Sequence, residues 1–286
     1  MSKLKIENVS YVYSPGTPFE VKALDNVSVE IKENAITGII GHTGSGKSTL
    51  VQMLNGLIKP TSGKILLDGA DIWENPKEIS KIRFRVGLVM QYPEYQLFEE
   101  TVRKDIAYGP RNMGLDEEEM QKRVLAAASF VGLEQSLLDK SPFDLSGGQK
   151  RRVAIAGVMA MSPEVLVLDE PAAGLDPSGR NAIFEGICRY AEENGATIII
   201  VSHSMEDMAK YCDDIIVMHD GRVAMCGYKE EIFSMGDELK KIGLDIPEIT
   251  ELVLELEKYG INLGRNIYSV DMAEKALLGL FGGGKV

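Results

Sequence analysis

The stretch that decides the fold reads Gly41-His42-Thr43-Gly44-Ser45-Gly46-Lys47-Ser48. It follows an apolar run at residues 35–40, which predicts a buried strand, and it precedes residues 47–54, which predict a helix. Its glycines let the backbone turn where other residues cannot, so that successive N–H groups and the positive end of the helix converge on one place. A glycine-rich loop between a strand and a helix is the context that phosphate binding requires.

The side chains of this phosphate loop predict a nucleotide site that takes ATP together with Mg²⁺. Lys47 is expected to reach the β- and γ-phosphates, and Ser48 to occupy a position in the Mg²⁺ shell. The residues expected to contact the nucleotide are Gly41, His42, Thr43, Gly44, Ser45, Gly46, Lys47, Ser48 and Thr49. The competing interpretation is a glycine-rich turn that binds nothing, and an acidic strand end further along the chain argues against it.

That strand end is the apolar run Val165–Leu168 followed by two adjacent acids, Asp169 and Glu170. Such a run is typical of a buried parallel strand that delivers carboxylates at its C-terminal edge. Neighbouring side chains of a strand point to opposite faces, so the two acids are expected to have different roles. Asp169 is placed to hold Mg²⁺. Pro171 ends the strand at once, which disfavours a solvated acidic loop.

A second glycine-rich helix start, Leu145-Ser146-Gly147-Gly148-Gln149, lies far along the chain from the phosphate loop. A nucleotide site that one chain fills alone does not need it, so we expect this segment of a partner chain to close over the γ-phosphate. In their order, the phosphate loop, the Ser-Gly-Gly segment and the acidic strand resemble those of the ABC (ATP-binding cassette) ATPases. The resemblance implies an ATP-hydrolysing enzyme that works as a head-to-tail dimer.

The resemblance also implies roles for residues that carry little signal alone. Glu170 is expected to polarise the attacking water, and His203, a lone histidine after a buried strand, to contact the γ-phosphate. Gln91 matches the glutamine that senses Mg²⁺ or water. The implied catalytic set is Lys47, Gln91, Glu170 and His203, and the implied Mg²⁺ set is Ser48, Gln91 and Asp169. The residues implied to reach the partner's nucleotide are Ser146, Gly147, Gly148, Gln149 and Asp176.

An aromatic side chain near the N-terminus is implied to stack on adenine. The alternating segment 6–13 predicts a strand that ends in Tyr13. By resemblance Tyr13 is the stacking residue, and Tyr11, expected on the same strand face, is the alternative. Either could instead be an ordinary half-buried tyrosine of the strand.

The pattern along the chain predicts an α/β fold with a P-loop NTPase core. A mostly parallel sheet, an N-terminal antiparallel β part and a helical segment over residues 91–162 are expected to form one ABC ATPase domain, residues 1–235. Local signals support the helices, since Asp116 and Asp176-Pro177 predict helix starts and Gly195 predicts a stop.

Residues 236–286 predict a small α-rich extension beyond what an ATPase core needs. One helix is expected after Pro247 and another after Ser269. The first helix should carry an apolar stripe of Ile249, Leu252, Val253 and Leu256. The extension is either a lid on its own core or, as we expect, a contact between two ATPases.

The length, net charge and cysteine content of the chain limit the kinds of partner that it is expected to bind. With 286 residues the chain can hold one large domain and a smaller appendage. Its net charge of −12 disfavours binding to nucleic acid and recruitment to anionic lipid, since both would repel it. We expect neither a membrane span nor a signal peptide, so membrane attachment should run through a protein partner. The scattered cysteines, Cys188, Cys212 and Cys226, match no disulfide or metal-ligand spacing.

Within the ABC ATPases, residues 91–114 and 151–161 resemble the energy-coupling factor (ECF) transporter ATPases. The segment Tyr92-Pro93-Glu94-Tyr95 resembles the second of their two paralogous ATPases, and Ala172, where Thr is more usual, is a departure. The resemblance implies an importer of vitamins or transition-metal ions. It also implies a paralogous ATPase, a transmembrane coupling protein and a small substrate-binding membrane protein as partners, with this chain peripheral on the cytoplasmic face of the cell membrane.

The loop at residues 91–98 is unusually aromatic for an exposed segment, and we expect helices of the coupling protein to dock there. Whether the two ATPases are paralogues or copies of one chain is left open. The alternative function is a soluble ABC ATPase that acts as a scaffold or clamp in iron–sulfur assembly, repair or translation. A P-loop kinase is disfavoured by the Ser-Gly-Gly segment and by the absence of a substrate lid.

Overall fold

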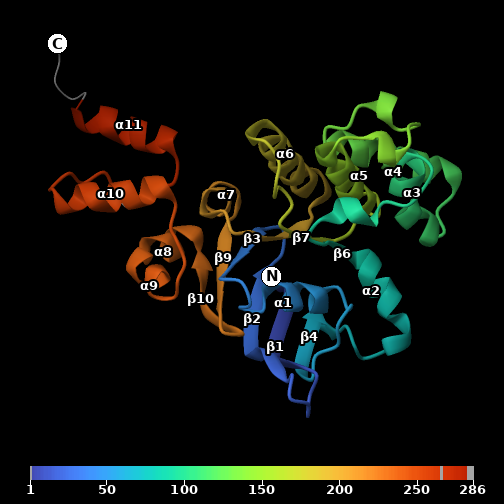
Figure 1. Ribbon diagram of the computed structural model, residues 1–286, viewed down its shortest axis with the longest axis horizontal. Helices are drawn as coiled ribbons and strands as arrows, with labels where there is room; N and C mark the ends of the chain where they lie inside the picture. The colour runs from blue at the N-terminus through green and yellow to red at the C-terminus, as the bar shows by residue number, and fades with distance from the viewer. Residues whose placement is uncertain (1, 265–266, 282–286) are drawn as a thin grey trace.

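Two β-sheets and their covering helices build the computed structural model, which describes residues 2–264 and 267–281 (Figure 1). The first sheet is antiparallel, with its strands in the order β2-β1-β4-β5. These strands are β1 (Ser2–Tyr13), β2 (Val21–Lys32), β4 (Ser62–Leu67) and β5 (Ala70–Asp71). This sheet is the N-terminal antiparallel part that the sequence predicts.

The second sheet is parallel except at one edge, where β9 and β10 pair antiparallel. Its order is β10-β9-β3-β8-β7-β6. The strands are β3 (Ile36–Ile40), β6 (Val86–Val89), β7 (Val165–Asp169), β8 (Thr197–Val201), β9 (Asp214–His219) and β10 (Arg222–Tyr228). The predicted α/β class with a mostly parallel sheet is confirmed. Because β3, β7 and β8 run the same way, the residues that follow them meet at one edge.

Alternation along the parallel strands divides the apolar side chains between two cores. In β7, Val165 and Val167 pack with the antiparallel sheet and with α1 (Lys47–Leu54), whereas Leu166 and Leu168 pack on the opposite side. Successive strand side chains point to opposite faces, so a strand that is apolar throughout must be covered on both. The antiparallel sheet covers one face of the parallel sheet, and a layer of helices covers the other.

Six helices follow α1 in the chain before the C-terminal part. They are α2 (Ile79–Arg85), α3 (Val102–Asn112), α4 (Glu117–Phe130), α5 (Gly147–Met159), α6 (Pro177–Asn194) and α7 (Met205–Tyr211). Short 3₁₀ turns are η1 (Pro76–Glu78), η2 (Pro93–Gln96), η3 (Gln135–Leu137) and η4 (Pro142–Asp144). Asp116 and Asp176 cap α4 and α6 as predicted, and Gly195 ends α6 in the left-handed conformation. Figure 1 shows α3, α4 and α5 together at one end of the molecule.

The C-terminal part adds α8 (Lys229–Ser234), α9 (Gly236–Lys241), α10 (Glu248–Lys258) and α11 (Val270–Phe281). The main core does not stop at residue 235, because Leu239, Leu244 and Ile246 belong to it. Helices α10 and α11 also form a small apolar cluster of their own, centred on Val253. Within the described ranges, no helix is both long and apolar enough to cross a membrane.

The predicted stripe of α10 is partly buried and partly exposed. Leu252 is 51% exposed, whereas Leu254, outside the stripe, packs against the main core. The helix is held at Thr250, whose hydroxyl donates to the carbonyl of Ile267 at 2.8 Å. Ile249 and Leu252 line one apolar groove, so these two stripe residues share a face of the helix.

Candidate nucleotide site

A cavity of about 360 Å³ lies at the edge of the parallel sheet where β3, β7 and β8 end. The predicted site residues that line it are Tyr13, Thr43, Gly44, Gly46, Lys47, Ser48, Thr49, Gln91, Asp169, Glu170 and His203. Ligands of open α/β sheets bind at this edge, outside the carboxyl ends of the strands. Tertiary structure thus brings together, in one chain, side chains that are up to 190 positions apart, from Tyr13 to His203.

The phosphate loop surrounds the N-terminus of α1, whose first amide groups point at the cavity. Gly46 stands at the N-cap with a left-handed φ of 99°, and an added Cβ would lie 2.5 Å from the carbonyl oxygen of Ala23. Glycine is therefore required there. Lys47 is buried and donates to the carbonyls of Gly41 and His42, at 2.5 and 2.9 Å. The loop thus holds its own cation beside the amides of a helix start, an arrangement that attracts phosphate.

Three predicted loop residues do not line the cavity. An added Cβ on Gly41 would lie 2.3 Å from the carbonyl oxygen of Met218, so this glycine permits close contact between the loop and β9. The side chain of Ser45 is fully buried, and that of His42 is turned toward the β9–β10 turn. These three residues therefore contribute to the conformation of the loop and not to the lining of the cavity.

Ser48 and Asp169 lie side by side, as the predicted Mg²⁺ position requires. The Ser48 hydroxyl donates to Asp169 Oδ2 at 3.1 Å, and Asp169 is buried. A hydroxyl and a carboxylate are oxygen ligands of the kind that Mg²⁺ takes beside phosphate oxygens. These two residues therefore fit a Mg²⁺ ion. Gln91, beyond the end of β6, lines the same cavity from the other side.

Glu170 is held in an uncommon backbone conformation, with a left-handed φ of 52°. Its N–H donates to the Val201 carbonyl at 2.9 Å, which ties it to the end of β8. One carboxylate oxygen lies 3.5 Å from Ser202 Oγ, and the other is buried without a hydrogen-bond partner among the described residues. His203 Nε2 lies 3.6 Å from that second oxygen, too far for a hydrogen bond. An unpaired buried carboxylate oxygen is available to accept a proton from water.

Burial controls the protonation of these groups. It raises the pKa of Asp169 and the pKa of Glu170, and the charge of Asp169 raises the pKa of Glu170 further. Burial also lowers the pKa of Lys47 and, together with the charge of Lys47, the pKa of His203. The lowered pKa favours the neutral imidazole of His203, which can donate a hydrogen bond without carrying a charge.

The structure shows which of the two tyrosines near the N-terminus lines the cavity. Tyr13 lines the cavity and its hydroxyl lies 3.2 Å from Thr49 Oγ1. Tyr11 is partly buried against the core between the sheets, and its ring contacts that of Tyr13 edge to face, with centroids 4.8 Å apart. This contact agrees with the prediction that both lie on one strand face, and of the two it is Tyr13 that lines the cavity.

The predicted partner-facing residues lie outside the cavity. Ser146 caps α5 in a capping box with Gln149, accepting from the Gln149 amide at 3.3 Å and donating its own amide to Gln149 Oε1 at 3.0 Å. The start of α5 packs closely against the loop before α6, as an added Cβ on Gly148 would lie only 3.2 Å from the Leu175 side chain. The Asp176 carboxylate caps α6 at 2.9 Å from the Gly179 amide, so it is already engaged within the chain.

The sequence analysis missed some residues of the site, because they belong to no recognisable motif. Val21, Lys22, Ala23 and Val201 line the cavity through the pairing of strands. A further link is Arg151, which donates to both oxygens of Glu94, at 2.8 and 3.0 Å, and to the Ala173 carbonyl. Arg151 follows the Ser-Gly-Gly segment and Glu94 follows Gln91, so one buried guanidinium joins three loops of the predicted site.

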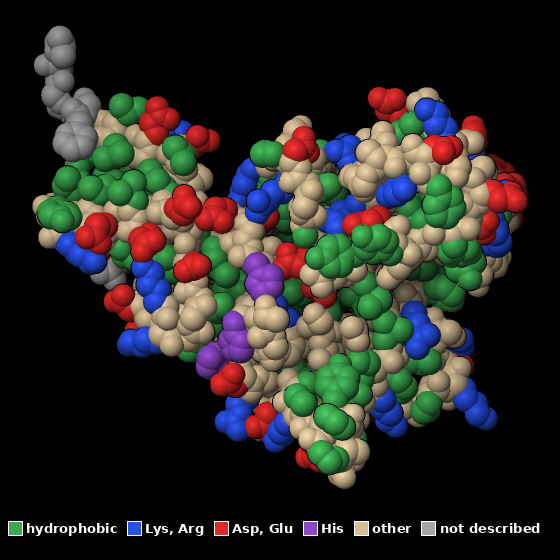
Figure 2. Space-filling model, viewed as in Figure 1, with side chains coloured by type: hydrophobic (Ala, Val, Ile, Leu, Met, Phe, Trp, Pro, Cys, Tyr) green, Lys and Arg blue, Asp and Glu red, His purple; other side chains and the backbone are tan. Residues whose placement is uncertain are grey.

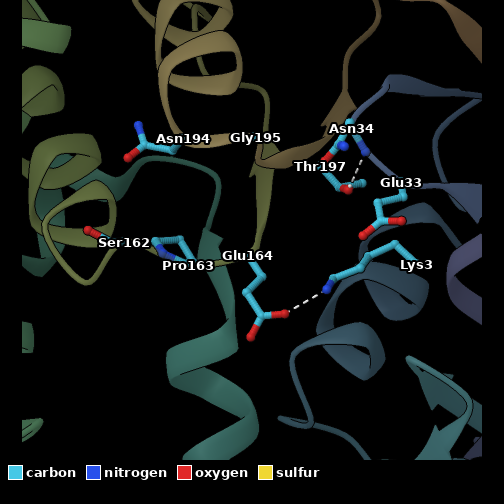
Figure 3. A pocket seen from close by; sticks show the side chains of 9 residues that line it. All are labelled: Lys3, Glu33, Asn34, Ser162, Pro163, Glu164, Asn194, Gly195 and Thr197. Carbon is cyan, nitrogen blue, oxygen red and sulfur yellow. Dashed lines mark hydrogen bonds and ion pairs between the residues drawn. The ribbon is translucent and has the colours of Figure 1, made fainter.

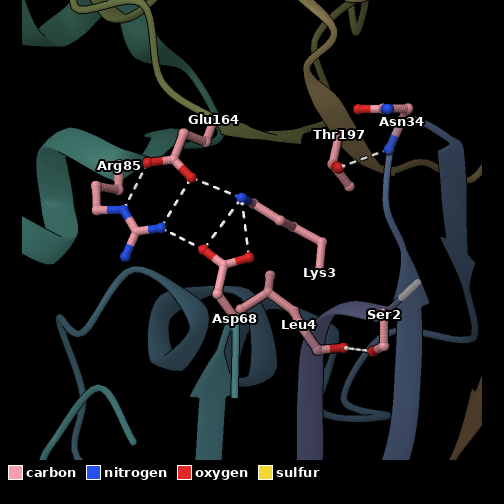
Figure 4. Close-up of polar contacts among 8 residues, drawn as sticks. All are labelled: Ser2, Lys3, Leu4, Asn34, Asp68, Arg85, Glu164 and Thr197. Atoms are coloured by element: carbon pink, nitrogen blue, oxygen red, sulfur yellow. Dashed lines mark hydrogen bonds and ion pairs between the residues drawn. The ribbon is translucent and has the colours of Figure 1, made fainter. Parts of the chain in front are cut away.

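A smaller cavity, about 230 Å³, lies at the opposite edge of the parallel sheet (Figure 3). Glu164, which precedes β7, and Lys3 face each other across it at 2.6 Å. Figure 4 shows that Arg85 and Asp68 extend this contact into a network of alternating charges. The hydrogen bonds from Arg85 lower the pKa of Glu164 to about 2. This network joins the two sheets and the end of α2, and its ionic groups are paired with one another, so it is structural.

Comparison with known proteins identifies the site. The sequence family described as ABC transporter matches residues 24–173. The chain is 56% identical over 276 residues, 96% of each chain, to the energy-coupling factor transporter ATP-binding protein EcfA2 of Clostridium acetobutylicum. The chain belongs to the ABC transporter family, among the ATP-binding proteins of ECF transporters. The resemblance to the second ECF ATPase is thereby confirmed.

Two solved structures of this family are similar over most of the chain. One is cbiO1 from Clostridium perfringens, part of the ABC transporter complex cbiONQ, with a TM-score of 0.75, 43% identity, and coverage of 88% of this chain and 98% of that one. The other is the dimeric ATP-binding cassette MJ0796 in a post-hydrolysis state with ADP and phosphate, with a TM-score of 0.71, 31% identity, and coverage of 79% and 98%. The ABC transporter ATPase binds and hydrolyses ATP, as predicted. The roles of individual residues remain predictions.

Proposed function

We propose that this ABC transporter ATPase energises an ECF-type importer of vitamins or transition-metal ions from the cytoplasmic face of the membrane. The proposal is carried by one observation, the division of the predicted site between two surfaces. The residues for phosphate, water and adenine line one cavity, whereas the Ser146–Gln149 segment lies elsewhere on the surface. A second cassette is then needed to complete each nucleotide site, supplied by a paralogue or by a copy of this chain.

Within one nucleotide site, the chain's own residues would each have a separate role. Lys47 and the amides at the start of α1 hold the phosphates, Tyr13 stacks on adenine, and Ser48, Asp169 and Gln91 hold Mg²⁺. Mg²⁺ would supply charge neutralisation on the phosphate oxygens. The unpaired oxygen of Glu170 accepts a proton from the attacking water, and neutral His203 donates toward the γ-phosphate.

The partner's Ser-Gly-Gly helix start would close the site from the other side. In Glu170→Gln the polarising carboxylate is lost, but the oxygen-lined cavity keeps its shape. We therefore expect this variant to bind ATP and to accumulate as a closed dimer. Gel filtration with and without ATP tests this, and Lys47→Ala is the matched control, whose elution should not change when ATP is added. A Glu170→Gln variant that hydrolyses ATP normally and elutes only as a monomer would contradict the composite site.

Coupling to a membrane protein would use the exposed aromatic side chains after Gln91. Tyr92, Tyr95 and Phe98 are 50%, 84% and 59% exposed. Phe98 also contacts Tyr108 edge to face, with ring centroids 4.9 Å apart, so the patch continues onto α3. Leu97 differs from the other three, because it packs against the main core. An aromatic patch of this kind suits apolar helices of a transmembrane coupling protein.

The coupling experiment compares three variants in the assembled transporter. Tyr95→Ser should keep the melting temperature and basal ATP hydrolysis but lose uptake and co-purification with the membrane partner. Tyr228→Ser, at a tyrosine that is 54% exposed on the opposite edge of the sheet, is the matched control and should keep all four properties. Leu97→Ala should instead lower stability. Normal uptake by a soundly folded Tyr95→Ser variant would refute the docking assignment but not the ATPase activity.

The C-terminal helices would form the contact between the two ATPases. Exposed apolar residues of this part are Leu252, Tyr259, Val270, Met272, Leu278 and Leu280. Figure 2 shows hydrophobic side chains gathered over α10 and α11. Between α7 and these helices lies an apolar groove of about 420 Å³ that includes Ile249 and Leu252. We retain the division into an ATPase domain and an extension, but the main core continues to Ile246, so a cut after Pro247 removes, among the described residues, only Tyr268 and the contact of Leu254 from it.

A further inference from the structure

The turn between β9 and β10 brings two side chains with metal-ligating atoms beside a third from the phosphate loop. The three are His42, His219 and Asp220, and one ligand atom of each lies within 4.8 Å of the others. The two imidazole rings stand nearly perpendicular, with centroids 5.0 Å apart. Figure 2 shows histidine side chains grouped at the surface beside an acidic side chain. None of the three lines the nucleotide cavity, so this cluster is separate from the ATP site.

The backbone holds these three residues together. His219 and Arg222 pair across a two-residue turn in which Asp220 and Gly221 have left-handed φ angles of 47° and 75°, as in a type I′ hairpin. The Gly221 amide donates to the Ser45 carbonyl of the phosphate loop at 3.2 Å, and its carbonyl accepts from the Asp25 amide at 2.8 Å. The turn is therefore fixed against the phosphate loop on one side and against β2 on the other.

The side chains are also oriented for ligation. His42 Nδ1 lies 2.8 Å from the Thr43 carbonyl, which can only accept, so Nδ1 carries the proton and the Nε2 lone pair is free. His42 Nε2 then lies 3.5 Å from Asp220 Oδ1. His219 Nε2 lies 3.5 Å from Asp220 Oδ2, and its Nδ1 is buried without a hydrogen-bond partner among the described residues. A backbone carbonyl that fixes the tautomer of a histidine is the usual support of a metal-ligating imidazole.

We propose that His42, His219 and Asp220 form a binding site for a divalent transition-metal ion of the Zn²⁺ class. Zn²⁺ binds imidazole nitrogen and carboxylate oxygen at about 2.0–2.2 Å, so the ligands of a tetrahedral ion lie about 3.4 Å apart. Each imidazole Nε2 lies 3.5 Å from a different oxygen of the Asp220 carboxylate, which is close to this spacing, and the fourth position is left for water. Imidazole ligands favour Zn²⁺, Ni²⁺ or Cu²⁺ over Mg²⁺, which prefers oxygen alone. The site therefore does not take the Mg²⁺ that accompanies ATP.

The test uses nucleotide-free full-length protein and ZnCl₂ as the probe. Calorimetry should detect one equivalent of Zn²⁺ in competition with excess Mg²⁺. Saturating Zn²⁺ should raise the melting temperature by about 5 °C, as expected for a ligand at a hundredfold excess over its Kd. His219→Ala should abolish this binding. Asp220→Asn, which preserves the left-handed turn, should weaken it more than about tenfold.

The controls separate this cluster from other Zn²⁺ sites on the chain. His203→Ala removes the remaining histidine of the sequence, beside Asp169 and Glu170, and Cys226→Ser removes an exposed thiol. Both variants should bind Zn²⁺ as the wild type does. His219→Ala must melt at the wild-type temperature without metal, which shows that it folds. Unchanged Zn²⁺ binding in folded His219→Ala, or loss of binding in either control, would overturn the assignment.

Discussion

Replacement of Arg151 by methionine is expected to lower the free energy of unfolding by about 3 kcal/mol. The Arg151 side chain is 4% exposed and that of Glu94 is 17% exposed, so the pair is largely removed from water. The change deletes two hydrogen bonds to Glu94 and one to the Ala173 carbonyl, and it leaves the Glu94 carboxylate buried without its cation. Breaking a buried pair on one side costs about 3–5 kcal/mol, and the remaining exposure of Glu94 favours the lower end.

Urea unfolding of the nucleotide-free chain measures this loss. Arg151→Met, Glu94→Gln and the double variant form a cycle, in which the double variant should lose at least about 1 kcal/mol less than the sum of the single ones. Arg152→Met is the matched control. Arg152 makes one exposed hydrogen bond, to the Gly132 carbonyl at 3.1 Å, and its replacement should cost less than about 1 kcal/mol. A cost of less than about 1 kcal/mol for Arg151→Met, or strict additivity in the cycle, would refute the reasoning.

The remaining predictions concern the loop, the catalytic carboxylate and the extension. Lys47→Ala should abolish ATP binding in a filter or calorimetric assay, because the loop loses its buried cation; wild-type turnover would contradict the phosphate-loop assignment. The raised pKa of Glu170 means that the folded chain holds this proton more tightly than the unfolded chain, so stability is lost as pH rises through the folded pKa. Nucleotide-free Glu170→Gln should therefore be about 1 kcal/mol more stable than wild type at pH 8, with the difference vanishing near pH 4; equal melting curves at pH 8 would refute this. Truncation after Pro247 should spare ATP binding but weaken nucleotide-free association of the two ATPases in sedimentation, whereas loss of ATP binding would support a lid.

The order of motifs was sufficient to predict the fold class and most of the nucleotide cavity. Each motif is a local device, a glycine-rich turn at a helix start or an acid at the end of a buried strand. Such devices depend on backbone conformation and alternation over a few residues, and these are written in the sequence nearby. In a parallel sheet the carboxyl ends of the strands meet at one edge whatever segments lie between them. The sequence was therefore enough to predict that Ser48, Asp169 and His203 lie close together.

Tertiary structure alone decided which neighbouring side chains share an environment. Tyr11 and Tyr13 contact each other edge to face, but only Tyr13 lines the cavity, whereas Tyr11 packs partly against the core. Leu254, outside the predicted stripe of α10, packs partly against the main core, whereas Leu252 of the stripe is 51% exposed. The contact of Arg151 with Glu94, and that of His42 with His219, join segments with no shared local pattern. Such pairings arise from long-range packing, and a single sequence leaves no trace of them.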